Sequence, residues 1–300
     1  MEKNIGFIGV GTMGKPMASN LLKAGFKVAV SPHKNRSPVQ ELEAQGATVY
    51  ASPKDVAAVS SVVVTCLPDS PQVKEVVTGP EGLLAGARPG LNIIDTSTIS
   101  PLVASEISTQ AAEKGCAFLD APMSGGQVGA IAGSLTFMVG GDKNAVDVCQ
   151  DVFNAMGKKL FYVGASGMGQ VVKLCNNLML GINLIGVCEA FTLGAKAGVN
   201  AATMAEVIQA SSGGSAVIER YFPRTILKNQ YQPGFMLKLM CKDILLALDT
   251  CQKLGVPSFA GNISAQVLEM VKNMGKGDAD FTVVATLFQD AAGVVIGKEG

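Results

Sequence analysis

A glycine pattern near the start of the 300-residue sequence could bind a phosphate group. The segment Gly9-Val10-Gly11-Thr12-Met13-Gly14 has the spacing G-x-G-x-x-G and follows an apolar, strand-like run, 5–8, and opens a helix-like run, 13–24. In such a pattern the first glycine permits a tight turn, the second lets a pyrophosphate approach the backbone, and the third lets helix and strand pack closely. The helix N-terminus then offers N–H groups to the anion. This context favours a dinucleotide site at Gly9, Gly11, Thr12, Met13 and Gly14 over an ordinary glycine-rich turn.

The end of the second predicted strand bears on the choice of dinucleotide. An NAD site usually carries Asp or Glu there, about 20 residues beyond the glycines. This strand ends without a carboxylate, at Ser31-Pro32, and is followed by His33, Lys34, Asn35 and Arg36. An arginine suits a 2′-phosphate because its planar guanidinium matches the phosphate oxygens. We therefore favour NADP(H) over NAD(H), and the alternative is a solvated basic loop.

Two further stretches could hold and protonate a small anion. In Asp120-Ala121-Pro122-Met123-Ser124-Gly125-Gly126, Ser124 supplies a hydroxyl, and Gly125 and Gly126 supply backbone N–H groups, at the end of a predicted strand where ligands bind. Lys173 and Asn177 are four residues apart, and therefore share one face of a helix that is apolar nearly all round. A buried ammonium could bind an anion and protonate a developing alkoxide. Taken alone, the first stretch is equally well explained as a turn, and the lysine is better explained as one that reaches solvent.

Alternating strand-like and helix-like segments position these stretches. Apolar runs predict strands at 5–8, 27–30, 62–66, 92–95, 117–119, 135–139 and 160–163, with helices such as 13–24 and 39–45 between the earlier ones. This alternation predicts an α/β fold with a Rossmann-type, doubly wound parallel sheet. From about Gly167 onward the chain is helical in pattern, with breaks near 198, 211–215, 233 and 255–257. We expect a dinucleotide-binding domain over 1–164 and an all-α substrate and dimerisation domain over 165–300, which begins with a long interdomain helix.

Composition excludes several classes of protein. The 24 Lys and Arg residues balance the 24 Asp and Glu residues, which argues against a nucleic-acid-binding protein. His33 is the only histidine, so a multi-histidine metal site is excluded. The seven scattered cysteines form no C-x-x-C motif, and the first residues run directly into a strand, so we expect a cytoplasmic protein without a leader. The longest apolar run, 174–188, is expected to be too short and too polar to span a membrane.

Together the three stretches resemble the β-hydroxyacid dehydrogenase family, of the 3-hydroxyisobutyrate dehydrogenase and tartronate semialdehyde reductase type. Residues 6–21 look like the family's cofactor motif, 120–126 like its substrate motif, and Gly169…Lys173…Asn177 like its catalytic motif. The resemblance implies that Lys173 is the general acid/base. It implies that the substrate is held by Ser124, Gly125, Gly126, Asn177 and Thr96. It also implies that Leu67, Pro68, Thr96, Phe235 and Lys242 contact the cofactor.

The expected activity is hydride transfer between a nicotinamide cofactor and a small 3-hydroxy acid or its semialdehyde, such as tartronate, succinate or methylmalonate semialdehyde. A homodimer or homotetramer is expected from the same resemblance. Two alternatives stay open: an imine reductase on the same fold and a non-catalytic nucleotide sensor. Imine reductases usually lack the lysine at this position, and sensors tend to lose the lysine or the Ser-Gly-Gly segment. NADP-type family members often carry Asn-Arg-Thr directly after the second strand, whereas Asn35-Arg36-Ser37 lies four residues further on here.

Overall fold

The computed structural model describes residues 4–33 and 35–297, and the chain divides into two compact units. The first unit is Met1–Lys173 and the second is Leu174–Gly300. The division falls inside one long helix, α10 (Met168–Lys196), so that residues 168–173 belong to the first unit. Because each unit has its own buried core, the two are described in turn.

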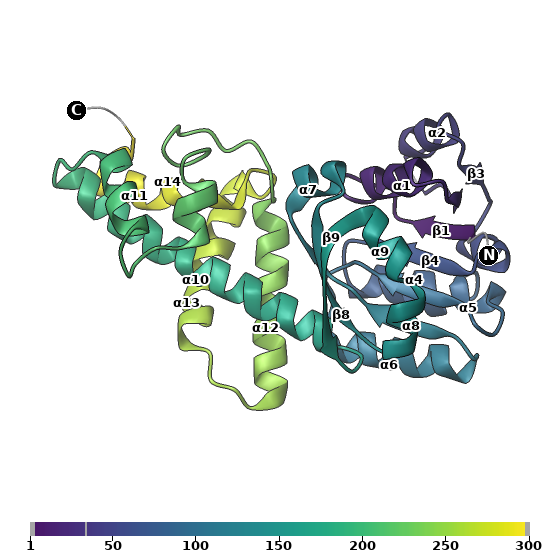
Figure 1. The fold of residues 1–300 in the computed structure, drawn as a ribbon. Coiled ribbons are helices and arrows are strands. Elements are labelled where there is room, and N and C mark those ends of the chain that lie inside the picture. The colour runs from purple at the N-terminus through teal and green to yellow at the C-terminus, as the bar shows by residue number, and fades with distance from the viewer. Residues whose placement is uncertain (1–3, 34, 298–300) are drawn as a thin grey trace. The chain divides into compact units, whose positions relative to one another are not determined.

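The first unit is built around one nine-stranded sheet, drawn from purple to teal in Figure 1. The strand order is β3-β2-β1-β4-β5-β6-β8-β7, and β9 also pairs with β8. All pairs are parallel except β6 with β8 and β7 with β8, which confirms the predicted Rossmann-type α/β sheet. The strands are β1 (Asn4–Ile8), β2 (Lys27–Val30), β3 (Thr48–Val49), β4 (Val62–Thr65), β5 (Asn92–Asp95), β6 (Ala117–Asp120), β7 (Met123–Ser124), β8 (Leu135–Gly140) and β9 (Gly157–Gly164).

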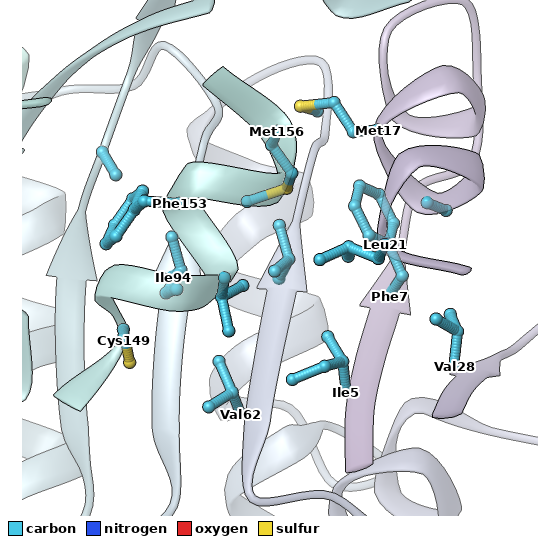
Figure 2. Packing of buried hydrophobic residues seen from close by; sticks show 14 of the residues in the cluster. Ile5, Phe7, Met17, Leu21, Val28, Val62, Ile94, Cys149, Phe153 and Met156 are labelled. Atoms are coloured by element: carbon cyan, nitrogen blue, oxygen red, sulfur yellow. The ribbon is translucent and has the colours of Figure 1, made fainter. Parts of the chain in front are cut away.

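Successive residues of the central strands pack into different cores on the two faces of the sheet. On β4, Val62 and Val64 belong to one cluster, whereas Val63 belongs to the other. Because side chains alternate across a strand, a strand buried on both faces needs an apolar residue at every position. Figure 2 shows the first cluster, in which Met17 and Leu21 of helix α1 (Gly14–Lys23) and Phe153 and Met156 of helix α9 (Gln150–Met156) pack over the strands.

Nine helices of the first unit's described residues connect these strands. They are α1 (Gly14–Lys23), α2 (Ser37–Glu43), α3 (Pro53–Val59), α4 (Ser70–Thr78), α5 (Leu83–Gly86), α6 (Pro101–Glu113), α7 (Gly126–Ala132), α8 (Lys143–Val148) and α9 (Gln150–Met156). The predicted strands 5–8, 62–66, 117–119 and 135–139 each differ from the structure by one residue at one end, and two differences are larger. The structure adds β3 and β7, which have two residues each, and it begins β9 at Gly157, three residues before the expected run.

Apart from one isolated β-bridge between Met236 and Asp280, the elements of the second unit's described residues are all helical, in agreement with the predicted all-α region. Its buried cluster gathers Phe191, Phe222, Leu237 and Phe281 from different elements. The breaks between helices fall near the glycines and prolines that the sequence indicated. Its elements, from the shared helix onward, are α10 (Met168–Lys196), α11 (Ala201–Gln209), η1 (Val217–Tyr221), α12 (Leu237–Leu254), α13 (Phe259–Val271), η2 (Lys272–Lys276), η3 (Phe281–Val284) and α14 (Ala285–Ala292).

Helix α10 is long and apolar enough to cross a membrane by length and composition. The expectation that its apolar run is too short is therefore wrong, because the helix extends beyond 174–188 in both directions. Leu184, Cys188 and Phe191 of this helix are buried in the core of the second unit. The same composition is expected of a helix that packs in the middle of a folded domain.

Candidate active site

Two of the three glycines after β1 are required by the protein's own packing. Gly9 has a φ of +94°, and a Cβ there would lie 2.2 Å from the backbone oxygen of Cys66. A Cβ on Gly14 would lie 2.0 Å from the backbone oxygen of Gly9. Any side chain at either position would collide with backbone, so these glycines let α1 and the β4 loop approach the turn.

Gly11 is different, because nothing within the protein demands a glycine there. Its φ is not positive, the residue is exposed, and no atom of the described residues outside its immediate neighbours lies within 4 Å of a Cβ built on it. Helix α1 begins just beyond, and no described side chain caps its N-terminus. An uncapped first turn leaves backbone N–H groups for an outside acceptor. The turn therefore fits a bound pyrophosphate, which would approach through the space over Gly11.

The loop after β2 is exposed and free of carboxylates. His33, Asn35 and Arg36 are all exposed, and Arg36 directly precedes α2. The side chain of Asn35 accepts a hydrogen bond from the backbone N–H of Ser37 at 3.1 Å, which folds the loop into a local turn. Lys34, the fourth residue predicted to contact the adenosine end, lies outside the described residues.

The ends of β4 and β5 are tied together by a buried carboxylate. Asp95 accepts hydrogen bonds from the hydroxyls of Thr65, at 2.7 Å, and Ser97, at 2.6 Å. The Ser97 hydroxyl in turn accepts the backbone N–H of Leu67 at 2.8 Å, and the Thr96 hydroxyl donates to the backbone oxygen of Thr65 at 2.7 Å. These bonds fix the loops that carry the predicted cofactor contacts at the carboxyl edge of the sheet. Leu67 and the exposed Pro68 follow β4, which lies next to β1 and its glycine turn.

A second buried carboxylate anchors the first turn of α10 to the end of β6. Asp120 has no exposed surface, and its two oxygens accept the backbone N–H groups of Gly167, at 2.7 Å, and Gln170, at 3.0 Å. A Cβ on Gly140 or Gly169 would lie only 2.8 Å from the Asp120 carboxylate, so both glycines make room for it. Burial raises the pKa of Asp120 to about 6, although the two backbone N–H groups lower it. The carboxylate thus caps the helix at its positive end.

We expect the Asp120→Asn variant to change how stability depends on pH. Since the pKa of Asp120 rises from an ordinary 3.8 to about 6 on folding, the folded protein binds more protons than the unfolded chain between these values. This contribution to the free energy of unfolding therefore falls as the pH rises through that interval, by about 3 kcal/mol for such a shift. Asparagine does not titrate, so the wild type should lose stability relative to the variant over the same interval, and the difference should then stay constant. Urea denaturation of both proteins across the pH range measures the two free energies of unfolding. A wild type that gained stability relative to the variant as the pH rose would contradict the assigned direction of the pKa shift.

Gln170 joins α10 to the loop after β5. Its side-chain oxygen accepts the backbone N–H of Ile99 at 3.0 Å, and its side-chain nitrogen donates to the backbone oxygen of Ser97 at 2.9 Å. Lys173 follows three residues later and is half-buried. The lysine that the sequence singled out therefore lies on a helical turn that is fixed to the ends of both β5 and β6.

The predicted substrate segment forms the junction of β7 and α7. Ser124 ends β7 and is half-buried, whereas Gly125 and Gly126 are exposed. The two glycines have φ values of 131° and 60°, a region that favours glycine. Such a turn leaves a hydroxyl and two backbone N–H groups on adjacent residues, which is a donor set suited to a carboxylate.

In the second unit, two predicted residues share one buried carboxylate. Asp243 on α12 is 2% exposed, and its Oδ2 accepts the side-chain amide of Asn177 at 2.6 Å. The Nζ of Lys242 lies 3.1 Å from its Oδ1. Asn177 is itself 2% exposed, and its side-chain oxygen accepts the amide of Asn176 at 2.9 Å. Asn177 and Lys242 are therefore held in place through Asp243.

Phe235, also in the second unit, lies on a segment held by a buried aspartate. Asp280 accepts the backbone N–H groups of Gly234, at 3.0 Å, and Phe235, at 3.2 Å. The half-buried Phe235 ring packs edge to face on Phe281 with a centroid distance of 6.1 Å. The ring is thus positioned by both its backbone and its neighbour.

The carboxylates and the carboxamide that organise these segments were not predicted from the sequence. Asp95, Asp120 and Gln170 are all fully buried. Their hydrogen-bond partners lie between 2 residues away, for Asp95 and Ser97, and 73 residues away, for Gln170 and Ser97. One signal was available, since Asp95 and Asp120 each end a strand directly after two large apolar residues. A charged residue at such a position is costly to bury without partners, so it indicates a hydrogen-bonded site.

Two family models match nearly the whole chain. The model described as the NAD binding domain of 6-phosphogluconate dehydrogenase matches residues 4–164. The model described as NAD-binding of NADP-dependent 3-hydroxyisobutyrate dehydrogenase matches residues 167–288. The first model coincides with the sheet and its glycine turn, and the second with the helical elements.

Individual relatives extend over the full length. The chain is 41% identical over 297 residues to the NAD-dependent L-serine dehydrogenase of Pseudomonas aeruginosa, covering 97% of this chain and 99% of the relative. It is 39% identical over 298 residues to the 2-(hydroxymethyl)glutarate dehydrogenase of Eubacterium barkeri, covering 99% of each. The solved structure of the Mycobacterium tuberculosis 3-hydroxyisobutyrate dehydrogenase with L-serine superimposes with a TM-score of 0.89 at 34% identity, and covers 96% of this chain and 100% of that one. Since the family models and the relatives match both the sheet and the helical elements, the chain belongs to the β-hydroxyacid dehydrogenase family and is a nicotinamide-dependent dehydrogenase.

Proposed function

We propose that this enzyme interconverts a small 3-hydroxy acid and its semialdehyde, with Lys173 as the general acid/base and NADP(H) as the preferred cofactor. The observation that carries the proposal is the double anchoring of the first turn of α10. Asp120 binds this turn to the end of β6, and Gln170 binds it to the loop after β5. Lys173 comes directly after the turn and is therefore held near the edge of the sheet where ligands bind.

The chain's own residues have distinct tasks in this reaction. In the reducing direction a nicotinamide cofactor, when bound, would supply a hydride to the carbonyl carbon. The ammonium of Lys173 donates a proton to the oxygen on which negative charge develops. In the oxidising direction the neutral amine of Lys173 accepts the hydroxyl proton. The Ser124 hydroxyl and the N–H groups of Gly125 and Gly126 hold the substrate carboxylate, and Asn177 orients the reacting hydroxyl.

The names of the relatives narrow the substrate class. L-serine, 2-(hydroxymethyl)glutarate and 3-hydroxyisobutyrate all carry a hydroxymethyl group on the carbon next to a carboxylate. We propose the same unit for the substrate of this enzyme, with a variable second substituent. Its oxidation gives a semialdehyde of the tartronate or methylmalonate type, whereas succinate semialdehyde would require a longer distance between carboxylate and reacting carbon.

A direct assay tests the proposal. The purified enzyme is incubated with each of the three hydroxy acids and with NAD⁺ or NADP⁺, and reduced nicotinamide is followed by absorbance; semialdehydes are tested in the reverse direction. Turnover of at least one hydroxymethyl acid is expected, and faster turnover with NADP⁺. Activity with NAD⁺ alone would overturn the cofactor preference. A folded enzyme that binds cofactor but turns over none of these compounds would overturn the substrate class.

Arg36→Ala is expected to lower kcat/KM for NADPH about tenfold to a hundredfold and to leave that for NADH within about twofold. A guanidinium hydrogen-bonded to a phosphate contributes about 1.5–3 kcal/mol, and NADH has no 2′-phosphate for it to contact. Steady-state kinetics with both cofactors measure the ratio. Arg88→Ala is a matched control, because Arg88 is likewise exposed but lies on the loop before β5. An equal loss for both cofactors in Arg36→Ala would place the guanidinium elsewhere on the nucleotide.

We further propose that the enzyme is a cytoplasmic homodimer or homotetramer. Supporting this, four apolar side chains on α10 and α13 are largely exposed: Met179 64%, Leu193 72%, Phe259 82% and Ile263 62%. Helices with such exposed side chains are typical of interaction surfaces. Light scattering coupled to size-exclusion chromatography gives the mass in solution, and a monomer at micromolar concentration would contradict the proposal.

A further inference from the structure

The Gln170 carboxamide makes an unusually complete set of bonds, although no role was predicted for it within the 169–177 motif. It has no exposed surface, and it accepts from Ile99 and donates to Ser97 at 3.0 and 2.9 Å. The backbone N–H of the same residue donates to Asp120 at 3.0 Å. One residue therefore links the start of α10 to the loop after β5 and to the end of β6.

The chemistry of these bonds selects glutamine. The partners are the carbonyl of one residue and the N–H of the residue two further on, so the side chain must offer a donor and an acceptor side by side. A carboxamide does this in one plane. A glutamate would keep the acceptor for Ile99 but would set a second oxygen against the Ser97 carbonyl. A methionine would fill a similar volume and satisfy neither backbone group, both of which would then be buried without a partner.

Gln170 lies three residues before Lys173 on the same helix. Residues three apart are neighbours on a helix surface, so a shift or rotation of the first turn moves both side chains together. The loop that Gln170 holds contains Thr96, which is expected to contact the cofactor. The hydrogen bonds of Gln170 thus fix the helical turn before Lys173 against the loop after β5, which is expected to contact the cofactor.

We propose that Gln170 is a positioning residue, which fixes the Lys173 amine against the loop after β5 for proton transfer. The inference rests on the proposed role of Lys173. A displacement of about 1 Å at a reacting group can lower the rate about a hundredfold, so loss of the Gln170 bonds reduces turnover although the side chain contacts neither substrate nor cofactor.

The test compares Gln170→Ala and the nearly isosteric Gln170→Glu with the wild type. Both variants are expected to lower kcat about tenfold to a hundredfold. The dissociation constant for the reduced cofactor, followed by its fluorescence, should stay within about twofold, as should KM for the hydroxy acid. The solvent deuterium isotope effect on kcat should increase, because transfer of the proton between substrate and a misplaced amine becomes slower than the other steps. A variant that is merely destabilised has fewer folded molecules, and its isotope effect is that of the wild type.

Gln289→Ala is the matched control. Gln289 is 4% exposed and likewise bridges two groups, since it donates to the Tyr231 hydroxyl at 3.4 Å and accepts the backbone N–H of Ile296 at 2.8 Å. Its kcat and isotope effect should equal those of the wild type. The positioning role is overturned if folded Gln170 variants keep wild-type kcat, or if kcat falls with an unchanged isotope effect. If those variants are fully active while Lys173→Ala is inactive, only this inference fails; if Lys173→Ala is fully active, the proposed function of the lysine fails first.

Discussion

Replacing Lys173 with alanine should lower kcat by about a thousandfold while the affinity for cofactor stays within about twofold. A positioned general acid/base contributes about a hundredfold to ten-thousandfold to a rate, and the enzyme has no second group of this kind among the residues assigned to the substrate. Alanine is the best helix former, so α10 should remain intact. Initial rates in both directions and a fluorescence titration with reduced cofactor measure the two quantities separately.

Two further variants separate proton transfer by Lys173 from the effect of its positive charge and from the effect of removing a lysine from α10. Lys173→Arg keeps a positive charge but cannot release a proton near neutral pH, so it should be nearly as inactive as the alanine variant. Lys196→Ala removes another lysine from the same helix, one whose Nζ donates to the backbone oxygen of Ala292, and should be fully active. Near-wild-type rates in Lys173→Ala would remove this residue from the mechanism. Full activity in Lys173→Arg would reduce its role to charge alone.

The parallel sheet could be predicted from sequence because burial on both faces leaves a simple pattern. Strands such as β4, Val62–Thr65, contribute to clusters on opposite sides and are therefore apolar at nearly every position. The predicted bounds of β2 and β5 agree with the structure at both ends. The two-residue strands β3 and β7 were not predicted, because two residues carry no periodicity. Their pairing is decided by the neighbouring strand and not by their own composition.

The motif residues of the candidate site were recognisable, but their supports were not. Gly9 and Gly14 belong to a spacing of six residues that is visible in the sequence itself. By contrast, Asp120 meets Gly167 across 47 positions, and Asn177 meets Asp243 across 66. No local pattern links such partners, since each bond exists only once the sheet edge or the helix pair has formed. The sequence could therefore indicate that Lys173 was unusual, but not what holds its helical turn.

The choice between NAD(H) and NADP(H) could be predicted only in part from the sequence. The absence of a carboxylate after β2 is visible in the sequence, and the structure leaves Asn35 and Arg36 exposed, as a phosphate-binding loop requires. The relatives carry both cofactor names, since one is called NAD-dependent and one family model refers to an NADP-dependent enzyme. Such a choice depends on a few surface side chains, so it can differ among enzymes with one fold.

Gly11→Ala should lower the affinity for the dinucleotide about tenfold to a hundredfold and leave folding stability within about 0.5 kcal/mol of the wild type. The added methyl group would enter open space, since no described atom beyond the adjacent residues lies within 4 Å of it. It would therefore meet only the cofactor, and would hold the pyrophosphate away from the N–H groups at the start of α1. A hydrogen bond to a charged group contributes about 1.5–3 kcal/mol, so the loss of one or part of one accounts for the expected factor. Cofactor titration and thermal unfolding without cofactor measure the two effects.

Two other glycines make this prediction specific. Gly9→Ala would put its Cβ 2.2 Å from the Cys66 backbone oxygen at a φ of +94°, so it should destabilise the fold itself, by more than Gly11→Ala in the absence of cofactor. Gly186→Ala, inside α10 with similar open space in the described structure, should change neither property except for a gain of up to about 1 kcal/mol from helix propensity. If Gly11→Ala bound cofactor as the wild type does, the pyrophosphate would have to lie away from this turn. The N–H groups at the uncapped N-terminus of α1 would then need an acceptor other than the pyrophosphate.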